Sequence, residues 1–179
     1  MINGGELNIL GIVAGTLMCL VFARAMLHKV GNFHEFLGYL TDYRVAPAQI
    51  AVHLARLSVL AELAVVIGLN VPSIRLASVL VGIGLLLVYA TAIAINLNRG
   101  RTEIQCGCGG PAQSLSWFLV VRNVTLCVIM TMAASLDMSP LSPVEVAVAI
   151  AGALIFWMVY LLIEQIHNNS LFVNRDARS

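Results

Sequence analysis

The chain has 179 residues, of which 60% are hydrophobic and 11% are charged, and its mean hydropathy is +0.93. A soluble globular domain is about 45–50% apolar and about 25% charged, so the composition excludes that class. It also excludes a disordered chain, which would be polar and rich in charge. Ten basic and nine acidic residues give a net charge of +1, which offers no basis for binding nucleic acid. The composition predicts a small integral membrane protein with a single membrane domain, residues 1–179.

Five apolar stretches are long enough to cross a membrane, because a helix needs about 20 residues to span about 30 Å of hydrocarbon. We expect these spans at about residues 7–27, 45–69, 76–98, 115–136 and 144–166. Lipid cannot satisfy free backbone groups, so such spans form helices. A β-barrel would need alternating apolar and polar residues, whereas residues 76–88 are almost continuously hydrophobic. The sequence therefore predicts an all-α integral membrane protein.

The connection between the first two spans, residues 28–44, contains a short amphipathic segment. From Phe33 onward, four apolar residues recur at the spacing i, i+3, i+4 and i+7, while the charged residues fall on the other side. This spacing is typical of a helix with one apolar face. We expect an interfacial helix over about residues 32–43, lying on the membrane surface and in contact with the lipid bilayer.

The basic residues are distributed unequally between the two sides of the membrane. Five spans place the first and third connections and the C-terminus on one side, which carries seven basic residues, whereas the other side carries one, Arg75. The seven are Arg24, Lys29, Arg44, Arg99, Arg101, Arg175 and Arg178. Because basic loops favour the cytoplasm, this distribution alone places the third connection, residues 99–114, in the cytoplasm.

Two of the four cysteines, Cys106 and Cys108, stand one residue apart in the polar, glycine-rich connection 99–114. Cys19 and Cys127 fall inside spans, where a cysteine behaves as a small hydrophobic residue. The neighbouring glycines allow the bent backbone that a disulfide between such close residues requires. A small, strained disulfide ring is easily reduced, and the start of a helix beside it favours the thiolate. The C-x-C pattern therefore predicts a redox-active catalytic pair at the membrane surface.

An inert loop and a metal site are the two alternative interpretations of this cysteine pair. A structural zinc site takes four ligands, and the connection supplies two cysteines with no histidine near them. His34 in the first connection could contribute, but nothing pairs with it. An iron–sulfur cluster also needs more ligands than the connection supplies. We therefore expect no metal.

Ionisable side chains inside the spans are costly in a membrane and are candidate functional groups for that reason. The second span carries His53, Arg56 and Glu62, and the fourth span carries Arg122 and Asn123. The structural interpretation is internal pairing, for instance of Glu62 with Arg122 or Arg56. The functional interpretation is that Arg122 and Asn123 form a polar pocket beside the cysteines.

Gln113 and Trp117 flank the start of the fourth span. An aromatic residue in such a place is typical of an anchor at the membrane interface. Contact of these two side chains with a partner protein is the functional alternative.

The segment CGCGGPAQSLSWFLVVRN, residues 106–123, resembles the signature of the MauE family of methylamine utilisation proteins. Lys29 with the following FHEFLGYL segment, Pro47 and Glu62 extend the resemblance over nearly the whole chain. It implies a role in maturing methylamine dehydrogenase, whose light subunit is rich in disulfides and carries a tryptophan-derived quinone. The implied partner is MauD, a membrane-anchored, thioredoxin-like periplasmic protein.

The layout is also similar to that of vitamin K epoxide reductase, which has a four-helix bundle and a surface half-helix after the first span. This resemblance implies a four-helix transmembrane bundle with a fifth transmembrane helix added. Its members carry a CxxC motif where this chain has Cys106 and Cys108 with one residue between them. Quinone-reducing members typically carry a second cysteine pair in the first connection, and residues 28–44 contain no cysteine. A quinone is therefore possible as a cofactor but not favoured.

The MauE resemblance implies a periplasmic cysteine connection in the inner membrane of a bacterium, opposite to the orientation that the loop charges favour. We expect the periplasmic orientation, because exchange on an exported substrate occurs where that substrate is. The leading hypothesis is a thiol–disulfide oxidoreductase or isomerase that works with MauD on disulfides of the light subunit. We favour Cys106 as the attacking thiol, expecting it to be the outer and more exposed sulfur. The alternatives are a non-catalytic membrane scaffold that stabilises MauD and a quinone-linked disulfide oxidase.

Overall fold

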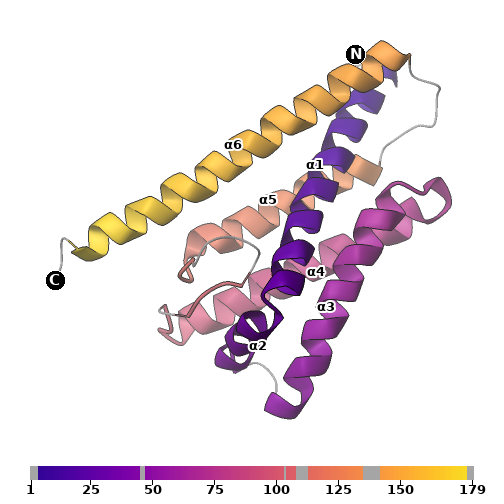
Figure 1. Ribbon diagram of the computed structural model, residues 1–179. Coiled ribbons are helices and arrows are strands. Elements are labelled where there is room, and N and C mark those ends of the chain that lie inside the picture. The colour runs from indigo at the N-terminus through magenta and orange to yellow at the C-terminus, as the bar shows by residue number, and fades with distance from the viewer. Residues whose placement is uncertain (1–3, 45–46, 103, 108–112, 135–141, 177–179) are drawn as a thin grey trace.

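The computed structural model describes residues 4–44, 47–102, 104–107, 113–134 and 142–176. These residues form helices and connections without a β-strand, and five of the helices are long and apolar enough to cross a membrane, which confirms the predicted all-α membrane fold. In chain order the elements are α1 (Gly4–Gly31), α2 (Phe33–Asp42), α3 (Ala48–Leu69), the short 3-10 helix η1 (Pro72–Ile74), α4 (Arg75–Asn98), α5 (Trp117–Ala134) and α6 (Pro143–Asp176) (Figure 1).

Each of the five predicted spans corresponds to one long helix, but two helices are longer than hydropathy predicts. Helix α1 begins at Gly4 and ends at Gly31, and α6 continues to Asp176. The predicted interfacial helix is present as α2. Its place on the membrane surface stays a prediction.

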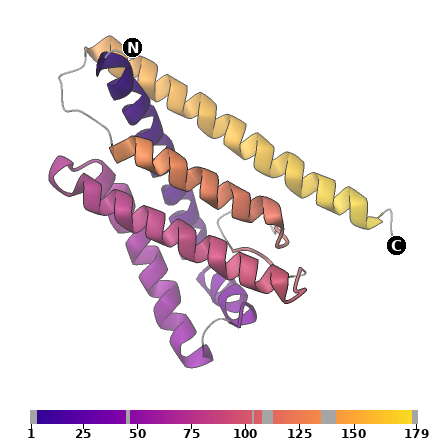
Figure 2. The same cartoon turned by 180° about the vertical axis from the view of Figure 1, so that it is seen from behind.

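Helices α1, α3, α4 and α5 pack side by side in a ring, each against the next, and form a four-helix bundle (Figures 1 and 2). Large buried side chains fill its centre, among them Met18, Phe22, Val65 and Met130. Gly82 of α4 faces this centre, and a Cβ atom there would lie 2.4 Å from Cε of Met130. Glycine at this position therefore lets α4 and α5 approach closely, as small residues do between membrane helices.

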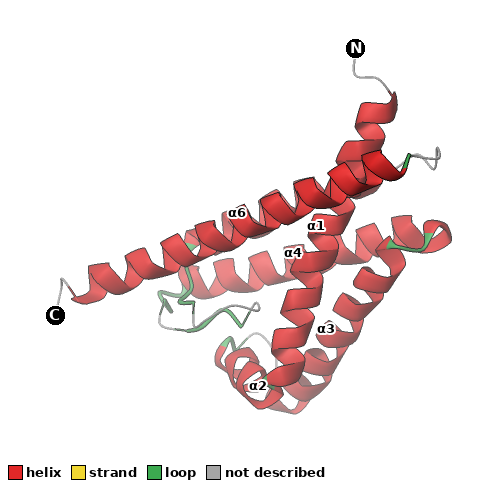
Figure 3. Cartoon of the chain, turned by 45° about the horizontal axis from the view of Figure 1, so that its top comes forward, coloured by secondary structure: helices red, strands yellow, loops and turns green. Residues whose placement is uncertain are grey.

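One end of the bundle, which we call the cysteine end, gathers most of the chemically interesting residues. Helix α2, the C-terminal ends of α1, α4 and α6, and the N-terminal ends of α3 and α5 all lie there (Figures 1 and 3). A second apolar cluster packs at this end and contains Tyr43, Ile93, Cys106, Leu115 and Leu119. Helix η1 lies at the opposite end, so α4 carries the chain back to the cysteine end.

Helix α6 lies outside the four-helix bundle and packs mainly against α1. The two helices come together near their N-terminal ends, where Ala149 and Ala153 are fully buried. A Cβ atom on Gly152 would lie 3.7 Å from a methyl group of Val13. From this crossing the helices diverge toward the cysteine end (Figures 1 and 2).

Candidate functional site

The backbone of Cys106 is held by hydrogen bonds from two directions. Its N–H donates to the carbonyl oxygen of Gln113 at 2.8 Å, and the N–H of Leu115 donates to the carbonyl oxygen of Ile104 at 3.0 Å. These bonds form a minimal antiparallel pairing between the two sides of the connection. From the end of α2, the hydroxyl of Tyr43 donates to the carbonyl oxygen of Cys106 at 3.1 Å. The loop and α2 together therefore fix the position of Cys106.

Cys106 is disulfide-bonded, whereas Cys19 and Cys127 are free thiols. Cys108, the other member of the predicted pair, lies outside the described residues. Only 6% of Cys106 is exposed, because the second apolar cluster surrounds it. The expectation of an exposed Cys106 is therefore not met, while its exposure relative to Cys108 lies outside the described residues.

Gly107 follows Cys106 and lies directly against α2. Its φ of +64° is in the left-handed region, which glycine adopts without the penalty that a Cβ atom brings. A Cβ atom would also lie 3.1 Å from Cδ2 of Tyr39 and 3.3 Å from Cδ2 of Phe36. Backbone conformation and available space thus both call for glycine between the two cysteines.

Two tyrosines that cover the cysteine connection have raised pKa values. Burial raises the pKa of Tyr43 well above its usual range, although the nearby Arg122 opposes the rise. Partial burial raises the pKa of Tyr39 to about 12, with a further contribution from the Glu35 carboxylate, to which its hydroxyl donates. Both phenols therefore stay protonated at physiological pH, and Tyr43 keeps the proton that it donates to the Cys106 carbonyl.

A cavity of about 560 Å³ lies behind Cys106, between α1, α2, α3 and α4. Cys106 and Gly107 form part of its wall, and Lys29 and Tyr89 add polar groups to it. The rest of the lining is mainly apolar or aromatic and includes Phe36, Leu54, Leu57, Leu85, Val88 and Ile93. The cavity therefore connects Cys106 to an apolar space between the helices, which opens on the side of α3 and α4 where Leu57 and Val88 are exposed.

A buried ion pair joins α1 to α3 beside this cavity. Nζ of Lys29 donates to Oε1 of Glu62 at 2.5 Å, and the two side chains are 1% and 0% exposed. The hydroxyl of Tyr89 accepts from Lys29 at 3.0 Å and donates to the same carboxylate oxygen at 2.9 Å. The ammonium group also lies 4.9 Å from the ring centroid of Phe36 and 4.5 Å from that of Tyr89. These contacts supply the paired environment that a charge needs inside a membrane.

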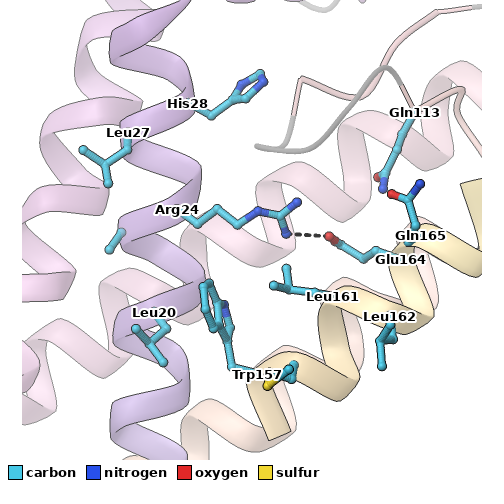
Figure 4. Close-up of a pocket in the computed structure, with 12 residues that line it drawn as sticks. Leu20, Arg24, Leu27, His28, Gln113, Trp157, Leu161, Leu162, Glu164 and Gln165 are labelled. Carbon is cyan, nitrogen blue, oxygen red and sulfur yellow. Dashed lines mark hydrogen bonds and ion pairs between the residues drawn. The ribbon is translucent and has the colours of Figure 1, made fainter. Parts of the chain in front are cut away.

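A second ionic cluster connects α1 and α5 to α6. Nη1 of Arg24 and Nη1 of Arg122 each donate to one oxygen of Glu164, both at 2.7 Å. The hydroxyl of Tyr160 donates to Glu164 as well, at 2.5 Å. Figure 4 shows Arg24 reaching across from α1 to Glu164 on α6. The carboxylate of Glu164 therefore accepts hydrogen bonds from two guanidinium groups.

The predicted pairing of Glu62 with Arg122 or Arg56 is wrong. Lys29 holds Glu62, and Arg122 points toward α6, where Glu164 binds it. The predicted pairing fails because α1 and α6 bring their own charged side chains to these two positions. Hydropathy gives no information about which helix faces which.

The remaining candidate residues do not gather at the cysteines as a group. His53 and Arg56 are exposed on α3, while Asn123 is buried and its amide donates to a carbonyl of its own helix at 2.9 Å. Gln113 is buried and contacts Cys106 through its backbone. Trp117 is 56% exposed at the first residue of α5, which suits either a membrane anchor or contact with a partner.

Lys29, Tyr89 and Tyr43 adjoin the site but are missing from the predicted set of site residues. Counting loop charges assigns Lys29, the single lysine of the chain, to a connection, whereas α1 extends past it to Gly31. A basic residue within an extended apolar helix is the signal that could have identified it. The tyrosines carry no such signal, because an uncharged tyrosine within or beside an apolar span is ordinary. In the described part of the chain, no group of three or more His, Cys, Asp or Glu side chains could hold a metal ion.

The model of the family described as methylamine utilisation protein MauE matches residues 7–138, which is most of the chain. The chain belongs to the MauE family. Membership implies a role in methylamine utilisation. The matched residues of this MauE protein include α1 to α5 and the cysteine connection, whereas α6 lies beyond them. Neither a curated protein nor a solved structure matches the chain, and the likeness to vitamin K epoxide reductase stays a prediction.

Proposed function

We propose that this MauE-family protein exchanges disulfides with the thioredoxin-like protein MauD, and so helps to form or isomerise disulfides in the light subunit of methylamine dehydrogenase. The observation that supports this most directly is the disulfide bond of Cys106 in a connection at one end of the bundle. Cys19 and Cys127 are free thiols, so Cys108 is the remaining cysteine of the chain with which Cys106 can pair. Family membership supports methylamine utilisation as the setting.

The buried position of Cys106 favours Cys108 as the sulfur that MauD attacks. A partner thiolate attacks Cys108, the bond between Cys106 and Cys108 breaks, a partner–Cys108 disulfide forms, and Cys106 leaves as a thiolate. A second partner thiol then gives up its proton and attacks the partner sulfur, and Cys108 leaves. The partner is now oxidised and the cysteine pair is reduced. The reverse steps reoxidise the pair and return MauD to its reduced form. Reduced MauD can open a light-subunit disulfide and becomes oxidised, and oxidised MauD can form one and becomes reduced, so the two steps together rearrange disulfides without net oxidation.

We infer that the cysteine end faces the periplasm of a bacterial inner membrane. Seven basic residues fall on this side by their position in the sequence, and two of them do not act as free loop charges. Arg24 and Lys29 belong to α1 and are paired with Glu164 and Glu62. The charge asymmetry that opposes a periplasmic cysteine end is therefore weaker than the sequence predicts.

Thiol trapping with a mass-shifting maleimide, with and without MauD, tests the exchange mechanism. The Cys106→Ser variant retains Cys108 and should accumulate a mixed disulfide with MauD. The Cys108→Ser variant should accumulate at least about tenfold less, because the buried Cys106 thiol reaches the disulfide of oxidised MauD slowly. The double variant Cys19→Ser/Cys127→Ser is the matched control and should behave like the unmodified chain. Serine variants that form no linked species yet still support dehydrogenase maturation would contradict exchange and show a scaffold instead.

A quinone-linked disulfide oxidase is the second candidate, and the cavity behind Cys106 favours it. The apolar and aromatic walls fit a quinone ring, and the Lys29 ammonium keeps a third proton beyond the two that it donates to Glu62 and Tyr89, so it supplies a hydrogen-bond donor. When bound, a quinone would accept two electrons and two protons from the reduced cysteine pair. Adding a soluble quinone to the reduced protein without oxygen should then restore the disulfide. If the quinone reoxidises the unmodified protein no more than it does the Cys106→Ser variant, the quinone-linked mechanism is wrong and exchange with MauD remains.

A further inference from the structure

We propose that the groove between α1 and α6 binds one anionic phospholipid, with its phosphate at Arg24 and His28 and an acyl chain along the apolar part of the groove. The site lies outside the cavity behind Cys106 and uses none of the cysteines. It does not depend on the exchange chemistry proposed above.

The groove has a volume of about 980 Å³ and changes from apolar to polar along its length. On the α1 side, Leu20 precedes Arg24 and His28, and on the α6 side Leu161 precedes Gln165. Both helices run toward the cysteine end, so the polar groups lie at that end and the apolar wall lies toward the middle of the membrane (Figure 4). A phospholipid has the same gradient between its head group and its chains.

The polar end of the groove carries an excess of one positive charge. Arg24 and Arg122 share a single carboxylate, that of Glu164. An uncompensated charge within the membrane is costly. An anionic head group beside Arg24, whose side chain is 27% exposed, would supply the missing countercharge.

Two residues that line the groove carry a buried polar atom without a hydrogen-bond partner among the described residues. These atoms are Nδ1 of His28 and Nε1 of Trp157. Figure 4 shows the His28 and Trp157 side chains in the space between the two helices. The indole N–H of Trp157 can only donate, and a buried donor is costly unless an acceptor meets it. The phosphate and ester oxygens of a phospholipid are acceptors, so they match this requirement.

A lipid fits this groove better than a protein helix or a soluble anion would. An apolar helix of a partner would cover the leucine wall but would bring no negative charge to Arg24. Free phosphate would compensate the charge but leave the apolar wall uncovered. A phospholipid does both, and it surrounds the protein in any bilayer.

Native mass spectrometry of the full chain in a neutral detergent tests the proposal. Phosphatidylglycerol, phosphatidylcholine and glycerol phosphate are added separately. We expect one retained phosphatidylglycerol, bound about tenfold more tightly than phosphatidylcholine, and no retained glycerol phosphate. The Arg24→Gln variant keeps the neutral Arg122–Glu164 pair and should lose this preference. The matched control Arg56→Gln removes an exposed arginine from α3 and should keep it.

A second variant keeps the test decisive if Arg24→Gln fails to fold. Trp157→Phe retains the aromatic ring and both ion pairs but removes the unpartnered N–H, and it should bind phosphatidylglycerol several-fold more weakly. Equal retention of the two lipids by the unmodified chain would overturn the proposal, as would an unchanged preference in both variants. Retention of glycerol phosphate alone would assign the polar end to a soluble anion and overturn the lipid site.

Discussion

Lys29 and Glu62 are charged side chains with almost no contact with solvent, and each depends on the other. Removing one partner of a buried pair leaves a charge without compensation, whereas replacing both by apolar groups of similar size is often neutral. In this protein the remaining oxygen of the carboxylate, Oε2 of Glu62, has no hydrogen-bond partner among the described residues. Glu62 would therefore have little to replace the contact with Lys29.

We expect Lys29→Met to lower the free energy of unfolding by about 3–5 kcal/mol. The double variant Lys29→Met/Glu62→Met should recover most of that loss, because no charge then remains unpaired. Denaturant unfolding in detergent micelles measures both, and Arg56→Gln, which changes an exposed charge, should stay within about 0.5 kcal/mol of the unmodified chain. If the double variant is as unstable as Lys29→Met, the pair stabilises the fold through its hydrogen bonds and packing and not only by neutralising charge.

For single residues, some contacts could be predicted from the sequence and others could not. Glycine between Cys106 and Cys108 predicts a bent connection, and the structure gives Gly107 a left-handed φ. The contact of Gly107 with the rings of α2 could not be predicted, because it depends on how α2 folds back over the connection. The partner of Glu62 was also hidden, since two acceptable arginines, Arg56 and Arg122, stood as competing candidates.

Among the helices, α6 differs from the others because side chains rather than close backbone packing connect it to α5. Glu164 accepts from Arg122, and the His167 ring stacks on Phe118 with ring centroids 4.0 Å apart. Nε2 of His167 also lies 3.1 Å from Oγ of Ser116. These contacts join α6 to the start of α5, immediately after the cysteine connection.

Glu164→Gln should destabilise the attachment of α6 more than His167→Ala does. The first change leaves two arginines without a carboxylate, which is expected to cost about 3–5 kcal/mol. The second removes one hydrogen bond and one ring contact, worth about 1–2 kcal/mol together. Thermal unfolding in detergent micelles gives the order of the two, and the reverse order would show that the stacked ring, rather than the carboxylate, holds α6.

Hydropathy predicts the existence of the helices well, because apolar stretches of this length have no other structure available in lipid. It predicts their ends less well. The predicted span ends at residue 27, yet α1 continues through His28 and Lys29 to Gly31. Lys29 in this last part is tolerated because a carboxylate on another helix pairs with it, which the sequence of α1 alone does not reveal.

For the whole molecule, the cysteine end and the η1 end should lie on opposite sides of the membrane. In a chain whose four cysteines are replaced by serine, Ser170→Cys reports on the cysteine end and Ser73→Cys on the η1 end, and both residues are exposed. With a membrane-impermeant maleimide applied from the periplasmic side, we expect labelling of Ser170→Cys and not of Ser73→Cys. The reverse pattern would place the cysteine end in the cytoplasm.

Fold class could be predicted for the whole molecule because composition leaves few alternatives. The orientation could not be predicted, since counting basic residues treats Arg24 and Lys29 as loop charges, although both belong to α1 and pair with carboxylates on other helices. The place of α6 was equally hidden. Nothing in a uniformly apolar span indicates that it packs outside the bundle against α1.

The crossing of α1 and α6 at small residues has a mechanical consequence. From Ala153 to Asp176, α6 extends roughly 35 Å beyond the crossing. A rotation of about 5° at the crossing would therefore move the far end by about 3 Å. Helix α6 would then turn about Ala149 and Ala153. His167 lies near the end that moves, against the start of α5. A molecule that wedges α1 and α6 apart would act on the cysteine connection from a distance, without touching either sulfur.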